Sequence, residues 1–194
     1  MKHLLVTFLI IISNICQSQE RELLYLWPGK VPGEIKEKQK PVIDTTRKDG
    51  VLRYTEITNP AIEVWLPDAK VSNGAAVIVC PGGGYVRLAY DKEGTEIAAW
   101  LNKQGYAAFV LSYRVPNKRY GAFQDAQRAL RIVRSNALKW NLNTDKIGII
   151  GFYHHPSCRF SFPVRLLLNR LHNMCIPRTA YSDNFIFHIH FRYP

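Results

Sequence analysis

Three consecutive glycines follow an apolar run, and a loop of this kind can do chemistry. Residues 75–80 read Ala-Ala-Val-Ile-Val-Cys, which predicts a strand covered on both faces, and Pro81-Gly82-Gly83-Gly84 ends it. Glycine permits positive φ and lets another group approach the backbone N–H groups closely. Such a loop can cradle phosphate, stabilise a developing oxyanion, or only turn the chain. The phosphate-loop Lys-Ser/Thr pair and the dinucleotide pattern G-x-G-x-x-G are both absent, so the last two alternatives stay open.

The elements around this loop predict an α/β fold. Apolar residues at helical spacing predict helices over residues 93–104 and 123–140, with Gly105 ending the first. Further strands are expected at residues 61–66, 107–111 and 146–151, with one short strand at 51–57. Strands alternating with helices in this way are typical of a mostly parallel sheet with right-handed crossovers. Asp125, near the start of the second helix, is interpreted as a helix cap rather than a catalytic acid.

Several motifs in a fixed order carry a family resemblance over residues 24–152. They are Trp27-Pro28-Gly29, Pro81-Gly82-Gly83-Gly84-Tyr85, Glu93-Gly94, Leu111-Ser112-Tyr113-Arg114-Val115, Asp125-Ala126 and Ile149-Ile150-Gly151-Phe152. Together they resemble the secreted esterase and lipase branch of the α/β-hydrolases, and in particular its acetyl-xylan-esterase-like and BD-FAE-like members. The resemblance implies a Ser-His-Asp/Glu triad that attacks carboxylic esters, often acetyl groups on plant polysaccharides, with no cofactor. It also implies that Gly83 and Gly84 supply the oxyanion-hole N–H groups, with Tyr85 and Tyr90 either bordering the pocket or packing.

The next family motif, G-x-S-x-G, fails in this chain. Gly151 and Phe152 supply its first two positions, but Tyr153 stands where the serine belongs and His155 where the closing glycine belongs. A phenol with a pKa of about 10 is no substitute, because the strained turn also needs small residues. Ser157 and Ser161 follow without flanking glycines and are not taken as replacements. We therefore expect a carboxylic-ester hydrolase by family that is inactive here, with the nucleophile, acid and histidine of the triad absent.

Composition changes at the same place. Residues 153–194 contain no Gly, Lys or Glu, but hold five of the six His. A change of reading frame after Phe152 would explain this, and a natural divergent C-terminus is the alternative. In either case we expect the later part of the sheet to be missing and the strand at 146–151 to become an edge. The expected parts are thus an N-terminal arm at 19–58, a partial hydrolase domain at 59–152, and a tail at 153–194 for which disorder is one interpretation.

The first 18 residues have the composition of an export signal. Met1-Lys2-His3 is a basic start, residues 4–12 are apolar apart from Thr7, and small or polar residues lead to Ser18. The apolar run is too short for a membrane span. Cleavage after Ser18 predicts a secreted or periplasmic protein. Acylation of Cys16 as a lipoprotein is the alternative, although Ile15 is bulky where a small residue is wanted.

Charge and cysteine content leave two other functions open. The chain has 26 Lys and Arg against 15 Asp and Glu, a net charge of +11, so an exported protein that binds acidic glycans without catalysis is the alternative function. An enzyme with a site rebuilt around Tyr153, His154 or His155 is the third possible function.

Four cysteines are too few for a disulfide scaffold, and neither C-x2-C nor H-x3-H spacing is present, so no metal is expected. We expect a small ester or an acetylated polysaccharide as substrate, no nucleic acid and no stable membrane insertion, while the oligomeric state stays open.

Overall fold

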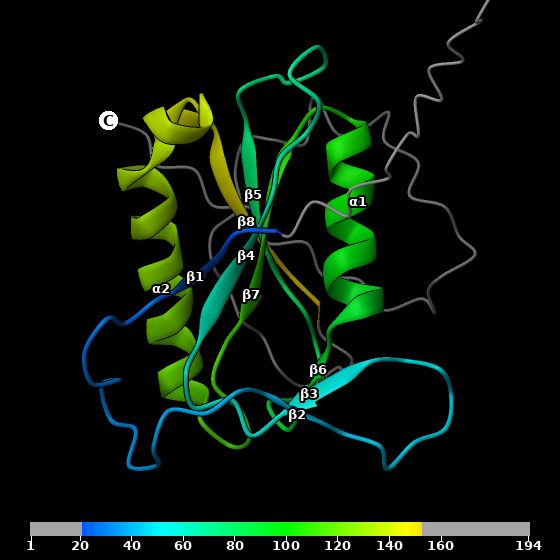
Figure 1. Ribbon diagram of the computed structural model, residues 1–194, viewed down its shortest axis with the longest axis vertical. Coiled ribbons are helices and arrows are strands. Elements are labelled where there is room, and N and C mark those ends of the chain that lie inside the picture. Colours follow the sequence, from blue (N-terminus) through cyan, green and yellow to red (C-terminus); the bar gives the residue numbers. More distant parts are fainter. Residues whose placement is uncertain (1–20, 153–194) are drawn as a thin grey trace, which may run out of the picture.

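A computed structural model describes residues 21–152, which form a mixed five-stranded sheet between helices (Figure 1). In spatial order the strands are β1 (Leu23–Tyr25), β4 (Ala61–Trp65), β7 (Ala107–Ser112), β5 (Ala76–Cys80) and β8 (Ile147–Gly151). Strands β7, β5 and β8 run parallel to one another, β4 is antiparallel to β7, and β1 is antiparallel to β4. Within the described part of the chain, β8 pairs only with β5 and so stands at one edge of the sheet.

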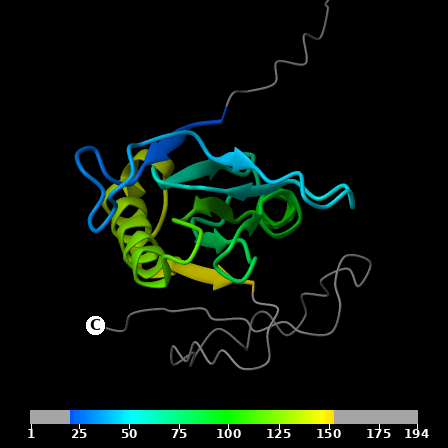
Figure 2. The same cartoon turned by 90° about the horizontal axis from the view of Figure 1, so that it is seen from below.

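The two faces of the sheet are covered by different helices (Figures 1 and 2). Helix α1 (Glu96–Lys103) continues a π-helical turn at Asp91–Thr95 and packs with Ala98 and Leu101 on one face. Helix α2 (Arg119–Ser135) packs on the other face with a row of small residues that includes Ala129. Every residue of β7 is buried because both of its faces are covered, as its unbroken apolar sequence predicts.

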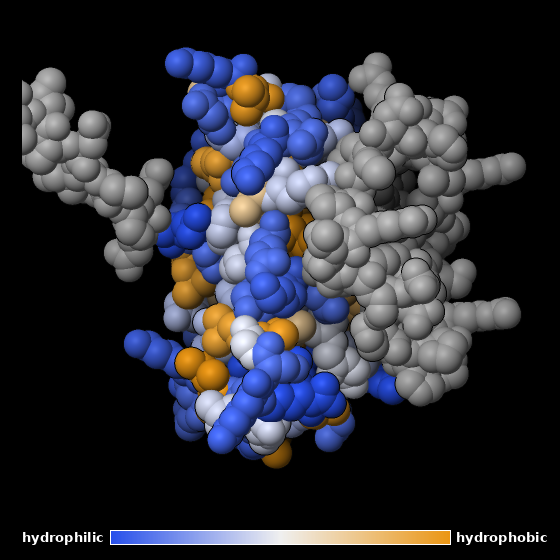
Figure 3. All heavy atoms as spheres, turned by 90° about the vertical axis from the view of Figure 1, so that its right-hand side faces the viewer, coloured by the Kyte–Doolittle hydropathy of each residue, from blue (hydrophilic) through white to orange (hydrophobic). Residues whose placement is uncertain are grey.

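A second, three-stranded antiparallel sheet lies beside the main one. It consists of β2 (Val42–Ile43), β3 (Arg53–Thr55) and β6 (Leu88–Ala89), with β3 in the middle. Short 3₁₀ turns at Ala137–Trp140 and Thr144–Lys146 connect α2 to β8. On the α1 side of the molecule the visible surface is mostly hydrophilic, with apolar side chains scattered rather than gathered in one patch (Figure 3).

The architecture confirms the expected α/β class, a mostly parallel sheet with flanking helices. The predicted strands at 61–66, 75–80, 107–111 and 146–151 are β4, β5, β7 and β8, and β3 falls within the predicted strand at 51–57. Gly105 ends the first helix as expected, with φ +81 and a Cβ position only 2.1 Å from the Val71 oxygen. None of the helices at residues 21–152 is long and apolar enough to cross a membrane.

Two expectations need correction. Helix α2 begins at Arg119 instead of residue 123 and ends at Ser135, where a 3₁₀ turn replaces its predicted last turn. Asp125 therefore lies inside the helix, fully buried, and is not a helix cap. The predicted signal segment at 1–18 and the tail at 153–194 lie outside the described residues.

Candidate active site

The glycine loop starts where β5 ends, and the end of β8 lies against it. The Phe152 N–H donates to the carbonyl oxygen of Cys80, the last residue of β5, over 3.2 Å. A Cβ built on Gly82 would lie 2.4 Å from the carbonyl oxygen of Phe152, so the two backbones are in contact. That carbonyl belongs to the peptide bond joining Phe152 to Tyr153. The fold thus brings the glycine loop to the chain position that precedes the expected nucleophile, at the carboxyl end of two parallel strands, where α/β proteins commonly bind ligands.

Steric limits explain why the loop needs glycine. A Cβ on Gly83 would lie 2.0 Å from the carbonyl oxygen of Arg87, and the φ of Gly83 is +145, where side chains are rarely found. Gly84 has φ +65 and no atom within 4 Å of its Cβ position, so conformation rather than space favours glycine there. The loop therefore follows a backbone path that ordinary residues cannot take without strain.

Four carbonyl groups of the loop, those of Pro81, Gly82, Gly83 and Tyr85, are already engaged. Hydrogen bonds to them come from Tyr113 Oη to Pro81 O (2.7 Å), Ala89 N to Gly82 O (2.9 Å), Val86 N to Gly83 O (3.1 Å) and Asn117 N to Tyr85 O (2.7 Å). The amide side is different. The Gly82 N–H donates to Glu93 Oε2 over 2.7 Å, whereas the N–H groups of Gly83 and Gly84 find no acceptor among the described residues. The loop therefore presents two neighbouring backbone donors, which is the pattern of an oxyanion hole.

Glu93 and Tyr113 hold the start of the loop, and the sequence did not reveal these roles. Glu93 comes from the π-helical turn before α1, and Tyr113 directly follows β7. Gly94 allows this approach, because a Cβ there would lie 2.9 Å from Val110 Cγ1. Burial raises the pKa of Tyr113 well above its ordinary value, so its hydroxyl stays protonated and remains a donor. The Glu93-Gly94 and Tyr113-Arg114 motifs marked these positions in the sequence without indicating their partners.

The two tyrosines named from the sequence have different surroundings. Tyr85 belongs to the loop, with φ +59, and its ring lies 6.1 Å from the ring of Tyr113. Tyr90 is 6% exposed, donates its hydroxyl to Glu63, and packs in a tilted arrangement against Tyr54 at 4.5 Å between centroids. Burial, followed by the nearby Glu63 carboxylate, raises the pKa of Tyr90. Of the two alternatives for Tyr90, the structure therefore supports packing.

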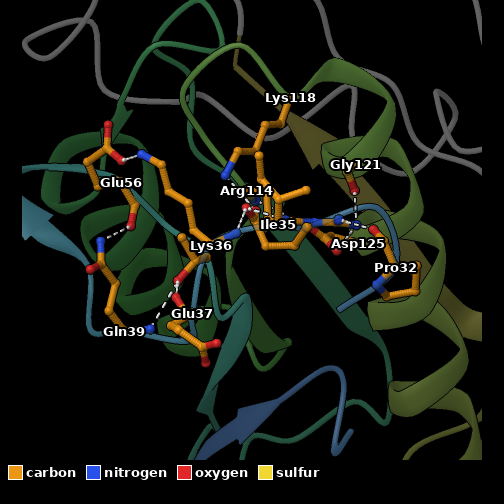
Figure 4. A network of polar contacts seen from close by, with 12 residues as sticks. Pro32, Ile35, Lys36, Glu37, Gln39, Glu56, Arg114, Lys118, Gly121 and Asp125 are labelled. Atoms are coloured by element: carbon orange, nitrogen blue, oxygen red, sulfur yellow. Dashed lines mark hydrogen bonds and ion pairs between the residues drawn. The ribbon is translucent and has the colours of Figure 1, made fainter. Parts of the chain in front are cut away.

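A buried ion pair links Arg114, the residue after Tyr113, to Asp125 of helix α2 (Figure 4). The Arg114 side chain is 2% exposed and the Asp125 side chain 0%, and Nε and Nη2 of Arg114 each donate to the carboxylate over 2.9 Å. Trp27 Nε1 donates to the same carboxylate over 2.9 Å, and Arg114 also donates to the carbonyl oxygens of Pro32 and Gly121. Asp125 is thus the centre of a network that joins the N-terminal arm to β7 and α2.

The described residues offer no cluster of three or more His, Cys, Asp or Glu that could hold a metal ion. Tyr153, His154, His155, Ser157 and Ser161 lie outside the described residues, so the structure gives no position for the side chains at the expected nucleophile turn.

A solved structure of a known protein has a similar fold. The crystal structure of an acetyl ester-xyloside bifunctional hydrolase from Caldicellulosiruptor lactoaceticus is similar with a TM-score of 0.51 and 30% sequence identity. The similarity covers 68% of this chain and 42% of that chain. The described residues therefore have the α/β-hydrolase fold of an esterase.

The sequence comparisons then narrow the resemblance. Residues 62–153 match the BD-FAE family model. An acetylxylan esterase of Xylanibacter ruminicola is 44% identical over 108 residues, which are 55% of this chain and 22% of that protein. Endo-1,4-beta-xylanase B of Butyrivibrio fibrisolvens is 38% identical over 82 residues, or 39% of this chain and 13% of that protein. The chain thus spans less than a quarter of these curated relatives, and the resemblance to BD-FAE-like α/β-hydrolase esterases is confirmed as a partial match.

Proposed function

We propose that this chain is a carboxylic-ester hydrolase of the acetyl-carbohydrate esterase type by descent, that it retains an oxyanion-binding loop, and that it does not hydrolyse esters. The observation that carries the first part is the pair of unengaged N–H groups at Gly83 and Gly84. In ester hydrolysis a tetrahedral intermediate places negative charge on the former carbonyl oxygen, and preorganised backbone donors stabilise that charge. The loop offers such donors beside the end of β8.

The absence of catalysis follows from the residue at the attacking position. Gly151 ends β8 and Phe152 follows it beside the loop, and Tyr153 takes the place of the serine in G-x-S-x-G. A phenol is bulkier than the serine hydroxymethyl group that this strained turn requires. Without an attacking group no acyl intermediate forms. Oxyanion binding alone gives about 10³ to 10⁴ over water in intact hydrolases that lack their triad. We expect this chain to do worse than that, because a bulky phenol also replaces the small residue at the turn.

The proposed substrate class comes from the relatives. One is named an acetylxylan esterase, one an acetyl ester-xyloside bifunctional hydrolase and one an endo-1,4-beta-xylanase. We assign acetylated xylan and related acetyl carbohydrates as the ligand class of the ancestral site. We also propose, from residues 1–18, that the chain is exported, so that the site lies outside the cytoplasm, where such polymers occur. N-terminal sequencing of the exported protein should then give Gln19 as its first residue.

The test is an esterase assay on the purified full chain, with folding verified by circular dichroism. We expect no release of 4-nitrophenol from 4-nitrophenyl acetate, and no acetate from acetylated xylan, above a buffer control. Turnover of about 1 s⁻¹ or faster, ordinary for an enzyme, would contradict the lost-nucleophile proposal. Translation of the other reading frames beyond codon 152 is a separate check: a Ser-x-Gly-Gly continuation supports a frame change, and its absence favours natural divergence.

Binding of acidic glycans is the second candidate, and the distribution of charge favours it. Residues 101–152 carry nine Lys and Arg against two Asp. On α2, Arg131 is exposed and Arg134 half-buried. Titration with a polyuronate at low and high salt tests this: binding that weakens steeply with salt supports it, and no binding at low salt removes it.

A further inference from the structure

One peptide group at the start of the glycine loop is held from both ends. The carbonyl oxygen of Pro81 accepts the Tyr113 hydroxyl over 2.7 Å, and the Gly82 N–H donates to Glu93 Oε2 over 2.7 Å. These two atoms belong to the same planar peptide unit, which links Pro81 to Gly82. The two side chains come from different elements: Tyr113 directly follows the strand β7, and Glu93 lies in the turn that precedes α1.

This double attachment fixes the plane from which the next two amides extend. A planar peptide with both polar atoms bound can no longer rotate about its flanking bonds, which anchors the start of the loop. The Gly83 N–H lies in the next peptide unit, together with the Gly82 carbonyl, and the Gly84 N–H lies in the same unit as the Gly83 carbonyl. Downstream, Ala89 N and Val86 N hold the carbonyl oxygens of Gly82 and Gly83. Preorganised donors of this kind stabilise an anion without paying for reorientation when it forms.

We propose that Glu93 and Tyr113 are positioning residues that preorganise the Gly83 and Gly84 amides for an oxyanion; this inference rests on the proposed oxyanion role of those amides. Glu93 also brings a negative charge close to the loop, and this charge by itself opposes anion binding. The hydrogen bond and the charge of Glu93 therefore act in opposite directions, which makes them separable by substitution.

The test measures binding of methylphosphonate, a tetrahedral anion, through the ¹H–¹⁵N resonances of Gly82, Gly83 and Gly84 in the labelled full chain. Glu93→Gln keeps an acceptor and removes the charge, so affinity should be unchanged or higher. Glu93→Ala removes both, and affinity should fall about tenfold, which corresponds to about 1.4 kcal/mol. If only the charge mattered, both variants would bind more tightly.

Tyr113→Phe tests the other end of the peptide and should also weaken methylphosphonate binding about tenfold, close to the net worth of one hydrogen bond. Matched controls are Glu96→Ala, which breaks an exposed pair with Lys92 of the preceding π-helical turn, and Tyr120→Phe, a residue that is 76% exposed. Both controls should leave the affinity and the three glycine resonances unchanged.

The outcomes separate this inference from the proposed function. If methylphosphonate shifts neither Gly83 nor Gly84 in the wild-type protein, the oxyanion role fails, and the inference falls with it. If the wild type binds and Glu93→Ala or Tyr113→Phe lowers only the thermal midpoint, with unchanged affinity, the residues are merely structural and the inference alone is overturned. Glu93→Gln is the variant that keeps the fold closest to the wild type. Its Gly82 amide proton resonance should move upfield, because a hydrogen bond to a carboxylate is stronger than one to a neutral amide. A Gly82 resonance that does not move also overturns the inference.

Discussion

Replacing Asp125 with alanine should destabilise the protein strongly, because it leaves a guanidinium buried without its counter-charge. Arg114 is 2% exposed and donates to this carboxylate from its backbone N and from two side-chain nitrogens, at 2.9 to 3.0 Å. Removing one partner of such a buried pair costs about 3–5 kcal/mol. Trp27 Nε1 loses its acceptor as well, which adds about 1 kcal/mol. The total is a large part of the 5–15 kcal/mol, roughly, that holds a domain folded.

The assay is urea unfolding followed by tryptophan fluorescence, at fixed pH and salt. Glu22→Ala is the control, since it breaks the exposed pair with Lys139 and should change the unfolding free energy by less than about 1 kcal/mol. The double variant Arg114→Met/Asp125→Leu removes both charges together and should be more stable than Asp125→Ala alone, because no unpaired charge stays buried. A loss below about 1 kcal/mol for Asp125→Ala would refute the reasoning, and so would a double variant less stable than that single one.

Three further predictions concern the loop, a thiol and the arm. Gly83→Ala should lower the thermal midpoint far more than Gly84→Ala, because only the first Cβ meets backbone, at 2.0 Å; equal effects in differential scanning calorimetry would contradict the steric account. Cys80 is half-buried, and burial raises the pKa of its thiol to about 12, so peptide mapping should find Cys80 alkylated by iodoacetamide at pH 8 much more slowly in the folded chain than in urea; equal rates would contradict the raised pKa. Burial by itself raises the pKa of Glu34, but its bonds to Lys118 and to backbone N–H groups outweigh this and lower it below the ordinary 4.5. Glu34 therefore stabilises the fold above that pH and loses this effect as the pH falls through its lowered value, so the stability difference between wild type and Glu34→Gln should shrink on acidification; a constant difference would contradict the linkage.

The sequence predicted the elements whose signals are local. Strands β5, β7 and β8 are continuous apolar runs because helices cover both faces of the sheet, and such runs are readable without knowing the neighbours. Strands β1, β2 and β6 have only two or three residues, too few for any periodicity, and form because partner strands are already in place. Asp125 was misinterpreted for a similar reason: its partner Arg114 lies on another element, so its helix position alone suggested a cap.

The candidate site divides in the same way. Three glycines after an apolar run predict an unusual backbone conformation, and the loop indeed follows strand β5. Glu93 and Tyr113 act on that loop from 11 and 32 residues away, and such pairings exist only after the layers have packed. The motif order of the family marked both positions, but no local pattern indicated which peptide atoms they would bind.

The arm that precedes residue 59 has a practical consequence for protein engineering. Trp27 and Pro32 both contribute to the hydrogen bonding of the Arg114–Asp125 pair, and β1 adds a strand to the main sheet. Recombinant versions that start at residue 59 would lack two hydrogen-bond partners of the buried Arg114–Asp125 pair. They would also lack β1, so that the edge of β4 would be unpaired. Anyone seeking a minimal soluble fragment should therefore keep the chain from residue 21 onward.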